Sequence, residues 1–272
     1  MPDAGAPIGV MDAGMGGYSV VKELQKILPD EDIVYFGEGA NQPYGNRSEE
    51  DILFLVRQCL DFLKAKKVKA VAVACNTISS LIDKYSPFYD FRIFSIVQAG
   101  SDDVVSMGLP EVGVLSTVFT AQTRCYEKLI RKDAPQTRVY AQGCPMLARI
   151  LEDGDFDKER IENELRATLG HLAEEHPDLK SLVLGCTHYP MALDYIKRLY
   201  PQFTVFINPA ATQAKMVADY LREENALNAQ GSGSLRIYTT SSVDTYERVA
   251  KIVGLVEPYT VELAPAPVPL GK

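Results

Sequence analysis

Two cysteines lie where hydrophobic segments give way to polar residues. Cys75 follows the mostly apolar segment 68–74, and Cys186 follows segment 181–185. Polar residues that include a threonine come next, and then a segment with helical character. A thiol at such a strand-to-helix junction lies near helix N–H groups, which favour the thiolate, the form of cysteine that acts as a base or nucleophile. Most free cysteines serve instead as small buried hydrophobes, but these polar neighbours favour a functional role.

The remaining cysteines suggest no shared chemistry. Cys59 and Cys125 lie within helical patterns, where we expect them to pack, and Cys144, which precedes a proline, fits either interpretation. Five cysteines without a CxxC pair favour free thiols over a disulfide framework. The chain has three histidines and no ligand pair at metal spacing, so we expect no metal site.

Several polar residues lie near expected strand ends. Asp12 stands in the glycine loop 12–17, where it either caps a helix or tunes a neighbouring group. The loop does not match the dinucleotide fingerprint, so nucleotide binding is disfavoured, although its N–H groups suit an anion. A lone histidine is usually structural, but His188 follows Cys186 by two residues, which favours an acid–base role. Glu152, which follows an apolar run, is typical of a solvated helix charge.

Two further segments carry groups that suit a carboxylate. Segment 42–48, "QPYGNRS", predicts a turn that presents Tyr44 and backbone N–H groups to an anion. Segment 116–120, "STVFT", ends an expected strand with hydroxyl groups that either bind a carboxylate or cap a helix. These hydroxyls belong to Ser116, Thr117 and Thr120.

The elements that would position these residues alternate between strands and helices, which predicts parallel sheets with helices on both faces. A helix over 48–67 is indicated by Ser48 and acidic residues at its start, an apolar i, i+3, i+4 pattern, and lysines at its end. The expected strands are 8–14, 32–38, 68–75, 92–97, 111–117, 137–143, 181–186, 203–208 and 235–240.

A pattern that occurs twice, far apart in the sequence, suggests that the chain has two similar halves. Segments 71–85 and 182–196 each contain an apolar strand, a cysteine, a threonine and then a helix. In open α/β sheets ligands bind at the carboxyl ends of the strands. Two such halves facing each other would place two thiols across one cleft. Segment 225–234 has the composition of a connector, and the end of the chain is rich in proline.

Composition sets the broad class. The chain has 272 residues, 46% of them hydrophobic, and a net charge of −8. An acidic surface argues against a nucleic-acid groove. The sequence contains no apolar run long enough for a transmembrane helix, and its first residues do not resemble a signal peptide. We therefore expect a globular protein of the cytoplasm, with no membrane or nucleic-acid partner.

Taken together, these motifs resemble one enzyme family. The segments are, in chain order, "GVMDAGMGG", "PYGNRS", "ACNT", "STVFT", "GCPMLARILEDG" and "GCTHYP". This set is similar to the glutamate racemases of the cofactor-independent aspartate/glutamate racemase family, and the resemblance runs from about residue 8 to 250.

The resemblance implies an isomerase that interconverts L- and D-glutamate for peptidoglycan synthesis, and so for cell wall biogenesis and cell shape, without pyridoxal phosphate or a metal. Cys75 would take the Cα proton from D-glutamate and Cys186 from L-glutamate. Asp12 would assist Cys75, and His188 and Glu152 would assist Cys186. The implied substrate contacts are Ala13, Pro43, Tyr44, Gly45, Asn76, Thr77, Thr117, Thr120 and Thr187.

The resemblance also implies a homodimer and two pseudo-symmetric α/β domains with the active site in the cleft between them. One domain would comprise 1–97 plus 207–272 and carry Cys75, and the other would comprise 98–206 and carry Cys186. The chain departs from the family pattern at four positions, where serine, aspartate, proline and aspartate are usual. Those positions hold Ala13, Glu38, Ala99 and Asn208.

Three alternatives stay open at this point. The protein could racemise aspartate or another amino acid, although the histidine of "GCTHYP" favours glutamate. It could be a binding or regulatory homologue with weak catalysis, as the departures at Ala13 and Glu38 allow. It could also be a thiol hydrolase that uses only one cysteine as a nucleophile.

Overall fold

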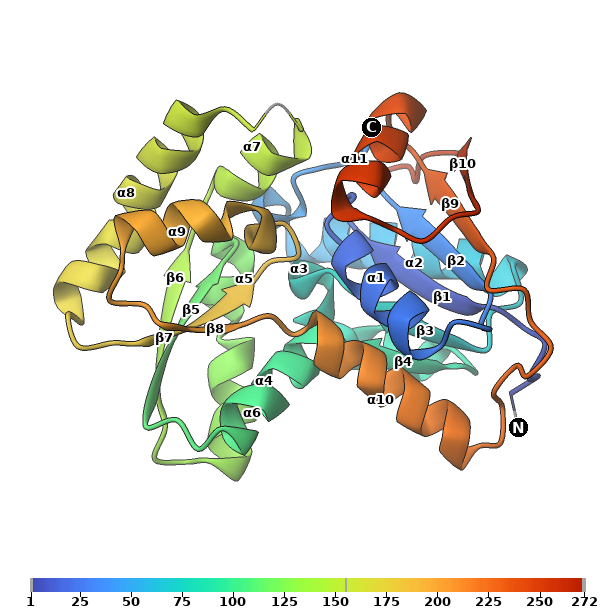
Figure 1. The fold of residues 1–272 in the computed structure, drawn as a ribbon, viewed down its shortest axis with the longest axis horizontal. Coiled ribbons are helices and arrows are strands. Elements are labelled where there is room, and N and C mark those ends of the chain that lie inside the picture. Colours follow the sequence, from blue (N-terminus) through green and yellow to red (C-terminus); the bar gives the residue numbers. More distant parts are fainter. Residues whose placement is uncertain (1, 155, 271–272) are drawn as a thin grey trace.

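Two parallel sheets flanked by helices make up the computed structural model, which describes residues 2–154 and 156–270 (Figure 1). Within those residues the first sheet has six strands in the order β10-β9-β2-β1-β3-β4. All its neighbouring strands pair in parallel. The strands are β1 (Ile8–Asp12), β2 (Ile33–Gly37), β3 (Ala70–Val73), β4 (Arg92–Ser95), β9 (Leu235–Thr239) and β10 (Tyr259–Leu263).

The second sheet has four strands, also parallel, in the order β6-β5-β7-β8. They are β5 (Glu111–Ser116), β6 (Arg138–Gly143), β7 (Ser181–Gly185) and β8 (Val205–Ile207). The chain therefore leaves the first sheet after β4 and returns to it after β8. This arrangement confirms the predicted fold class of two parallel sheets with flanking helices.

Helices cover both sheets (Figure 1). The α-helices are α1 (Tyr18–Ile27), α2 (Glu49–Ala65), α3 (Asn76–Ser79), α4 (Ile96–Ser106), α5 (Val118–Thr123), α6 (Cys125–Asp133), α7 (Leu147–Glu152), α8 (Lys158–Glu175), α9 (Leu193–Leu199), α10 (Ala210–Glu223) and α11 (Val243–Val253). Short 3₁₀ turns are η1 (Tyr44–Asn46), η2 (Ile82–Lys84), η3 (Ser86–Phe88) and η4 (Tyr189–Ala192). The part of the chain that the structure describes contains no helix with the length and apolar composition needed to cross a bilayer.

The expected elements agree with the structure with one omission. Ser48 caps α2 as predicted, since its hydroxyl accepts a hydrogen bond from the N–H of Asp51 at 3.2 Å. The omission is β10, which the sequence analysis did not predict. It is an edge strand with largely exposed side chains, so it lacks the continuous apolar run that marks the buried strands.

The two sheets share one buried apolar cluster. It includes Val10 of β1 together with Val114 of β5 and Val183 of β7. On α10, the buried Gln213 donates hydrogen bonds of 2.9 Å to the carbonyls of Val73 and Phe94, at the ends of β3 and β4. These contacts position the strand ends from which the polar segments emerge. The residue bounds of the two domains stay a prediction. The predicted boundary between residues 206 and 207 falls within β8.

Removal of one partner from a buried ion pair should strongly destabilise the protein. Lys69 Nζ lies 2.6 Å from Glu31 Oε2, and the two side chains are 0% and 2% exposed. Lys69→Met would leave a buried carboxylate without its charge partner, so we expect the free energy of unfolding to fall by about 3–5 kcal/mol. Urea unfolding measures this loss. The control is Lys215→Met, which removes an exposed pair with Asp219 and should cost less than about 1 kcal/mol. Equal losses of unfolding free energy in both variants would contradict the expected cost of leaving the Glu31 carboxylate buried without a partner.

Candidate active site

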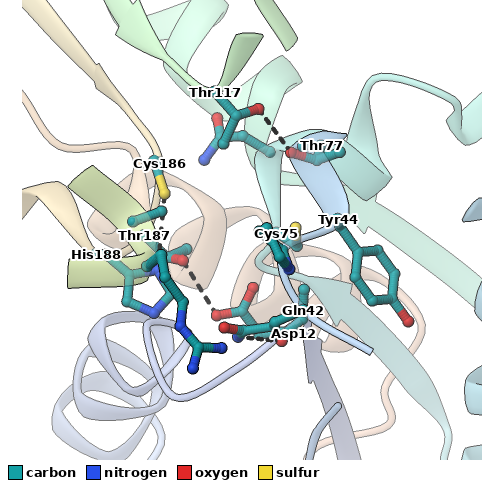
Figure 2. Close-up of a pocket in the computed structure, with 15 residues that line it drawn as sticks. Asp12, Gln42, Tyr44, Cys75, Thr77, Thr117, Cys186, Thr187 and His188 are labelled. Carbon is teal, nitrogen blue, oxygen red and sulfur yellow. Dashed lines mark hydrogen bonds between the residues drawn. The ribbon is translucent and has the colours of Figure 1, made fainter. Parts of the chain in front are cut away.

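One cavity collects most of the predicted site residues from both sheets (Figure 2). The predicted residues that line it are Asp12, Ala13, Pro43, Tyr44, Gly45, Cys75, Asn76, Thr77, Thr117, Cys186, Thr187 and His188. Three residues that the sequence analysis did not single out also line it: Gln42, Ala148 and Arg149. Two predicted residues, Thr120 and Glu152, lie behind this lining and contact residues that form it.

The two thiols lie on opposite sides of this cavity. Cys75 follows β3 and precedes α3, whereas Cys186 follows β7 in the other sheet. Figure 2 shows them apart across the space that both line. Both side chains are buried. Parallel strands bring their carboxyl ends to one edge of a sheet, and here those edges face each other, so the thiols reach one cavity from two directions.

Cys186 belongs to a chain of polar contacts that ends in the other sheet. Its Sγ lies 3.7 Å from Nδ1 of His188, and Nε2 of His188 lies 2.5 Å from Glu152 Oε2. The same Glu152 oxygen accepts a hydrogen bond from the N–H of Met15, in the loop after β1. Burial alone would lower the pKa of His188, but the bonds to Cys186 and Glu152 outweigh it and raise that pKa well above its usual value. A protonated imidazole can donate a hydrogen bond from Nδ1 to the sulfur of Cys186.

Cys75 lies in the opposite electrostatic setting. Burial raises the pKa of its thiol well above the usual value, and the nearby charge of Asp12 raises it further. The N–H groups of Ile78 and Ala13 offset only part of this effect. Cys75 is therefore held as a neutral thiol.

Asp12 connects the two sheets. One of its oxygens accepts a hydrogen bond from the N–H of Gly17 at 2.5 Å and another from Oγ1 of Thr187 at 3.1 Å. The first bond resembles helix capping, because Gly17 immediately precedes α1. Burial raises the pKa of Asp12 from its ordinary value, although His188, Thr187 and Gly17 act against that shift. A buried carboxyl group of this kind can hold a proton next to a thiol.

Hydroxyl and amide groups line another side of the cavity. Oγ1 of Thr117 lies 2.9 Å from the hydroxyls of both Thr77 and Thr120. The first of these contacts joins α3 to the segment before α5 (Figure 2). The phenol of Tyr126 donates a hydrogen bond of 2.7 Å to Oδ1 of Asn76. Because that oxygen is engaged, the amide Nδ2 of Asn76 is left as a donor toward the cavity.

The turn at η1 is fixed from behind. The ring of Tyr44 points away from the cavity (Figure 2), and its hydroxyl donates to Glu38 Oε2 at 3.0 Å. The other oxygen of Glu38 accepts hydrogen bonds from Asn41 and from Thr240 Oγ1. Tyr44 therefore offers its backbone to the cavity, not its phenol. Both carboxylate oxygens of Glu38, whose side chain is one methylene longer than the aspartate usual in the family, accept hydrogen bonds that hold the turn.

Side-chain direction explains the residues that the sequence analysis missed. Gln42 folds over the glycine loop and donates a hydrogen bond to the carbonyl of Ala13. Ala148 and Arg149 precede Glu152 on α7 by four and three positions, so they share its helix face. That spacing was an available signal, because the family resemblance already implied that Glu152 assists Cys186. Among the described residues, no group of three or more potential ligands is arranged to hold a metal.

Comparison with known proteins places the chain in a family. Residues 8–217 match the family described as Asp/Glu/Hydantoin racemase. Glutamate racemase 3 of Caldanaerobacter subterraneus subsp. tengcongensis is 36% identical over 94% of both chains. The glutamate racemase of Thermoanaerobacter pseudethanolicus is 35% identical over 91% of this chain and 92% of its own.

Solved structures agree with that placement. Glutamate racemase from Francisella tularensis, in complex with D-glutamate, has a TM-score of 0.87 at 30% identity and covers 96% of this chain and 98% of its own. Glutamate racemase RacE1 from Bacillus anthracis has the same TM-score and identity, with 97% and 98% coverage. The chain therefore belongs to the Asp/Glu/Hydantoin racemase family. Within it, these relatives, which it matches over nearly their whole length, are glutamate racemases.

The contact between His188 and Glu152 gives a direct prediction. Glu152→Gln removes the negative charge that helps to keep the imidazole protonated, so the folded-state pKa of His188 should fall. Titration of the His188 ring signals by NMR measures the shift. The control is Asp153→Asn, which removes a neighbouring charge but not the bond to His188. A fall of the same size in that control would show that the specific contact does not matter.

The same contact predicts how stability depends on pH. The pKa of His188 in the folded state lies above its unfolded value of about 6.5. The contact therefore makes its full contribution to the free energy of unfolding below the unfolded pKa. The contribution is lost as the pH rises through the raised folded pKa. Glu152→Gln should therefore destabilise the protein more near neutral pH than at alkaline pH. Urea unfolding over this pH range tests this expectation, which a constant difference would contradict.

Proposed function

We propose that this protein is a glutamate racemase that interconverts L- and D-glutamate with two thiols and no cofactor. The observation that carries the proposal is that Cys75 and Cys186 line one cavity from two different sheets. Racemisation removes the Cα proton from one face of the substrate and delivers a proton to the other, so two groups on opposite sides are required. The similar F. tularensis enzyme, solved with D-glutamate, supports glutamate as the substrate.

The contacts of the two thiols suggest their roles in one turnover. We assign Cys186, in contact with His188, as the base that takes the Cα proton of L-glutamate, and the neutral Cys75 as the acid that gives its proton to the opposite face. After the departure of D-glutamate, Cys75 is a thiolate and Cys186 is a thiol. In this state the site can convert D-glutamate back to L-glutamate. For a further turnover from L-glutamate, Cys186 releases its proton to water once the cavity has opened. The protonated form of Asp12 can supply a proton to Cys75 and is then reprotonated by water, so one proton is released and one is taken up.

Hydrogen-bond donors would stabilise the charge that develops at Cα. The amide of Asn76 and the hydroxyls of Thr77 and Thr117 line the cavity and suit the substrate carboxylate next to Cα, and Thr187 becomes a further donor once its bond to Asp12 parts. Donors that are already oriented cost little reorganisation when charge develops in the transition state. The bond from Tyr126 fixes the orientation of Asn76 in this way.

Substrate entry requires contacts across the cavity to part. The free space within it is about 40 Å³, which suffices for about three water molecules but not for an amino acid with two carboxylates. Two of the hydrogen bonds that cross between the sheets here are Thr77 to Thr117 and Thr187 to Asp12. Separation of the sheets would break both, and closure over the substrate would exclude water from the reaction.

The family resemblance supports the wider role. D-glutamate from this reaction would supply peptidoglycan synthesis, and the protein would act in the cytoplasm as a homodimer. Its two domains would comprise 1–97 plus 207–272 and 98–206. An aspartate racemase from Picrophilus torridus shares the fold at 15% identity and a TM-score of 0.59. That likeness extends to the fold alone, so it does not favour aspartate as the substrate.

Exchange in D₂O tests the proposal. L-glutamate with purified protein and no added pyridoxal phosphate should lose its Cα–H signal in NMR and its optical rotation together. Cys75→Ser and Cys186→Ser should each abolish racemisation, because each face needs its own thiol. Cys125→Ser, outside the cavity, should retain activity. If one of the two cavity substitutions proved harmless, the result would favour a mechanism with a single nucleophilic cysteine. If the protein exchanged the Cα proton of aspartate but not that of glutamate, aspartate would replace glutamate as the proposed substrate.

A further inference from the structure

The proline-rich end of the chain is held against the first sheet. We call residues 264–270 the tail. Its first residue, Ala264, belongs to the same buried apolar cluster as Tyr44. The N–H of Ala264 donates a hydrogen bond of 2.7 Å to the carbonyl of Thr239, at the end of β9. Further along the tail, Pro267 is also buried. The tail therefore begins at the carboxyl edge of the sheet, the edge from which the sheet's cavity residues emerge.

Helix α2 binds the outer part of the tail. The side chain of Gln58 donates a hydrogen bond of 3.0 Å to the carbonyl of Val268 and accepts one of 3.1 Å from its N–H. Oδ1 of Asp51 accepts a hydrogen bond of 3.1 Å from the N–H of Leu270. Asp51 and Gln58 are seven positions apart, so they share one face of α2. The backbone of the tail is thus bound by two side chains of a single helix face.

The tail also contacts the segment that contains the turn η1. The carbonyl of Pro267 accepts a hydrogen bond of 2.8 Å from Nδ2 of the buried Asn41. Arg47 joins Asn41 to Asp51, because its Nε donates to the carbonyl of Asn41 at 2.6 Å and its Nη1 contacts the Asp51 carboxylate. Asn41 and Arg47 flank η1 in the sequence. The tail therefore reaches both sides of the turn, directly at Asn41 and through Asp51 at Arg47.

The turn itself touches the other sheet. Pro43, Tyr44 and Gly45 line the catalytic cavity. A Cβ added at Gly45 would lie 2.8 Å from Cβ of Thr117, which follows β5. The turn is therefore seated between Thr117 on one side and the groups that the tail binds on the other. Release of the tail would let the turn withdraw from Thr117, and its backbone would no longer be oriented for a substrate.

We propose that the tail is a positioning segment, which holds η1 where its backbone can contact the substrate. This inference rests on the proposed function, in which glutamate occupies the cavity that η1 lines. A docked tail favours the ordered turn over looser arrangements of it, so the tail should act on substrate binding. It should have less effect on the proton transfers, because the thiols that perform them lie outside the hydrogen bonds that the tail makes.

Hydrogen exchange in matched variants tests this link. Gln58→Ala removes the side-chain bonds to Val268 and keeps a residue that favours the helix. Pro267→Gly keeps the backbone carbonyl but gives the free tail more conformations to lose when it docks. In each variant the amides of Asn46 and Arg47, which close η1, should exchange about 2- to 10-fold faster, the change that one hydrogen bond produces in an opening equilibrium. NMR of the full-length protein measures these rates.

Racemisation kinetics give the functional readout. Gln58→Ala and Pro267→Gly should each raise KM for glutamate by about 2- to 10-fold, with a smaller change in kcat. The control is Lys64→Ala, because Lys64 lies on the same helix but forms its exposed ion pair with Asp90 and not with the tail. This control should change neither the exchange of the η1 amides nor KM.

Several outcomes would overturn the inference. One is faster exchange at the amides of Val268 and Leu270 without any change at η1, and another is unchanged exchange in both segments. Equal effects in Gln58→Ala and Lys64→Ala would contradict it as well, since they would indicate a general loss of helix stability. A fall in kcat at constant KM, or a looser η1 with an unchanged KM, would exclude a role in substrate binding.

Failure of the proposed function can be told apart from failure of this inference, because hydrogen exchange does not depend on turnover. If the unmodified protein binds glutamate but does not exchange its Cα proton, the racemase proposal fails. Calorimetry would then replace kinetics, and a Kd for glutamate about 2- to 10-fold weaker in Gln58→Ala would still support positioning by the tail. If the unmodified protein does not bind glutamate, both proposals fail.

Discussion

A hydrogen bond between two sheets holds the site together. The carboxylate of Asp12, at the end of β1, accepts a bond from Thr187, which follows β7. Around it, Glu152 of α7 contacts Met15 of the first glycine loop, and Thr77 contacts Thr117. Each sheet alone presents one thiol at its edge. Only the contact between these two edges creates a chamber with a thiol on either side, so the chemistry depends on how the sheets meet.

Burial has opposite consequences at the two ends of that chamber. A low-dielectric surrounding penalises every charge, so Cys75 next to the carboxylate of Asp12 stays neutral. His188 is equally buried, but its bonds to Glu152 and Cys186 outweigh the penalty and keep it protonated. The two thiols are thus chemically similar groups in dissimilar surroundings. The two thiols have different neighbours, and this difference suits a reaction that needs one base and one acid at the same time.

The sequence predicted the fold well because buried parallel strands are continuous apolar runs, and it predicted both cysteines because they directly follow such runs. It could not predict β10, whose side chains are largely exposed. Periodicity alone interprets Glu152 as a solvated charge, yet its side chain lies against His188. Arg149 was missed for a related reason: which face of a short helix turns inward depends on tertiary packing, not on its own residues.

Two of the departures from the family pattern are polar side chains that find hydrogen-bond partners in this protein. Glu38 is satisfied by Tyr44, Asn41 and Thr240, and Asn208 accepts a hydrogen bond from the N–H of Ala210 at the start of α10. Neither Glu38 nor Asn208 lines the cavity, whereas Ala13 does and keeps its backbone N–H beside Cys75. A protein that only bound its ligand would have no need for two buried thiols, one beside a histidine and one beside a carboxylate. The retention of both settings therefore favours catalysis over a purely regulatory role.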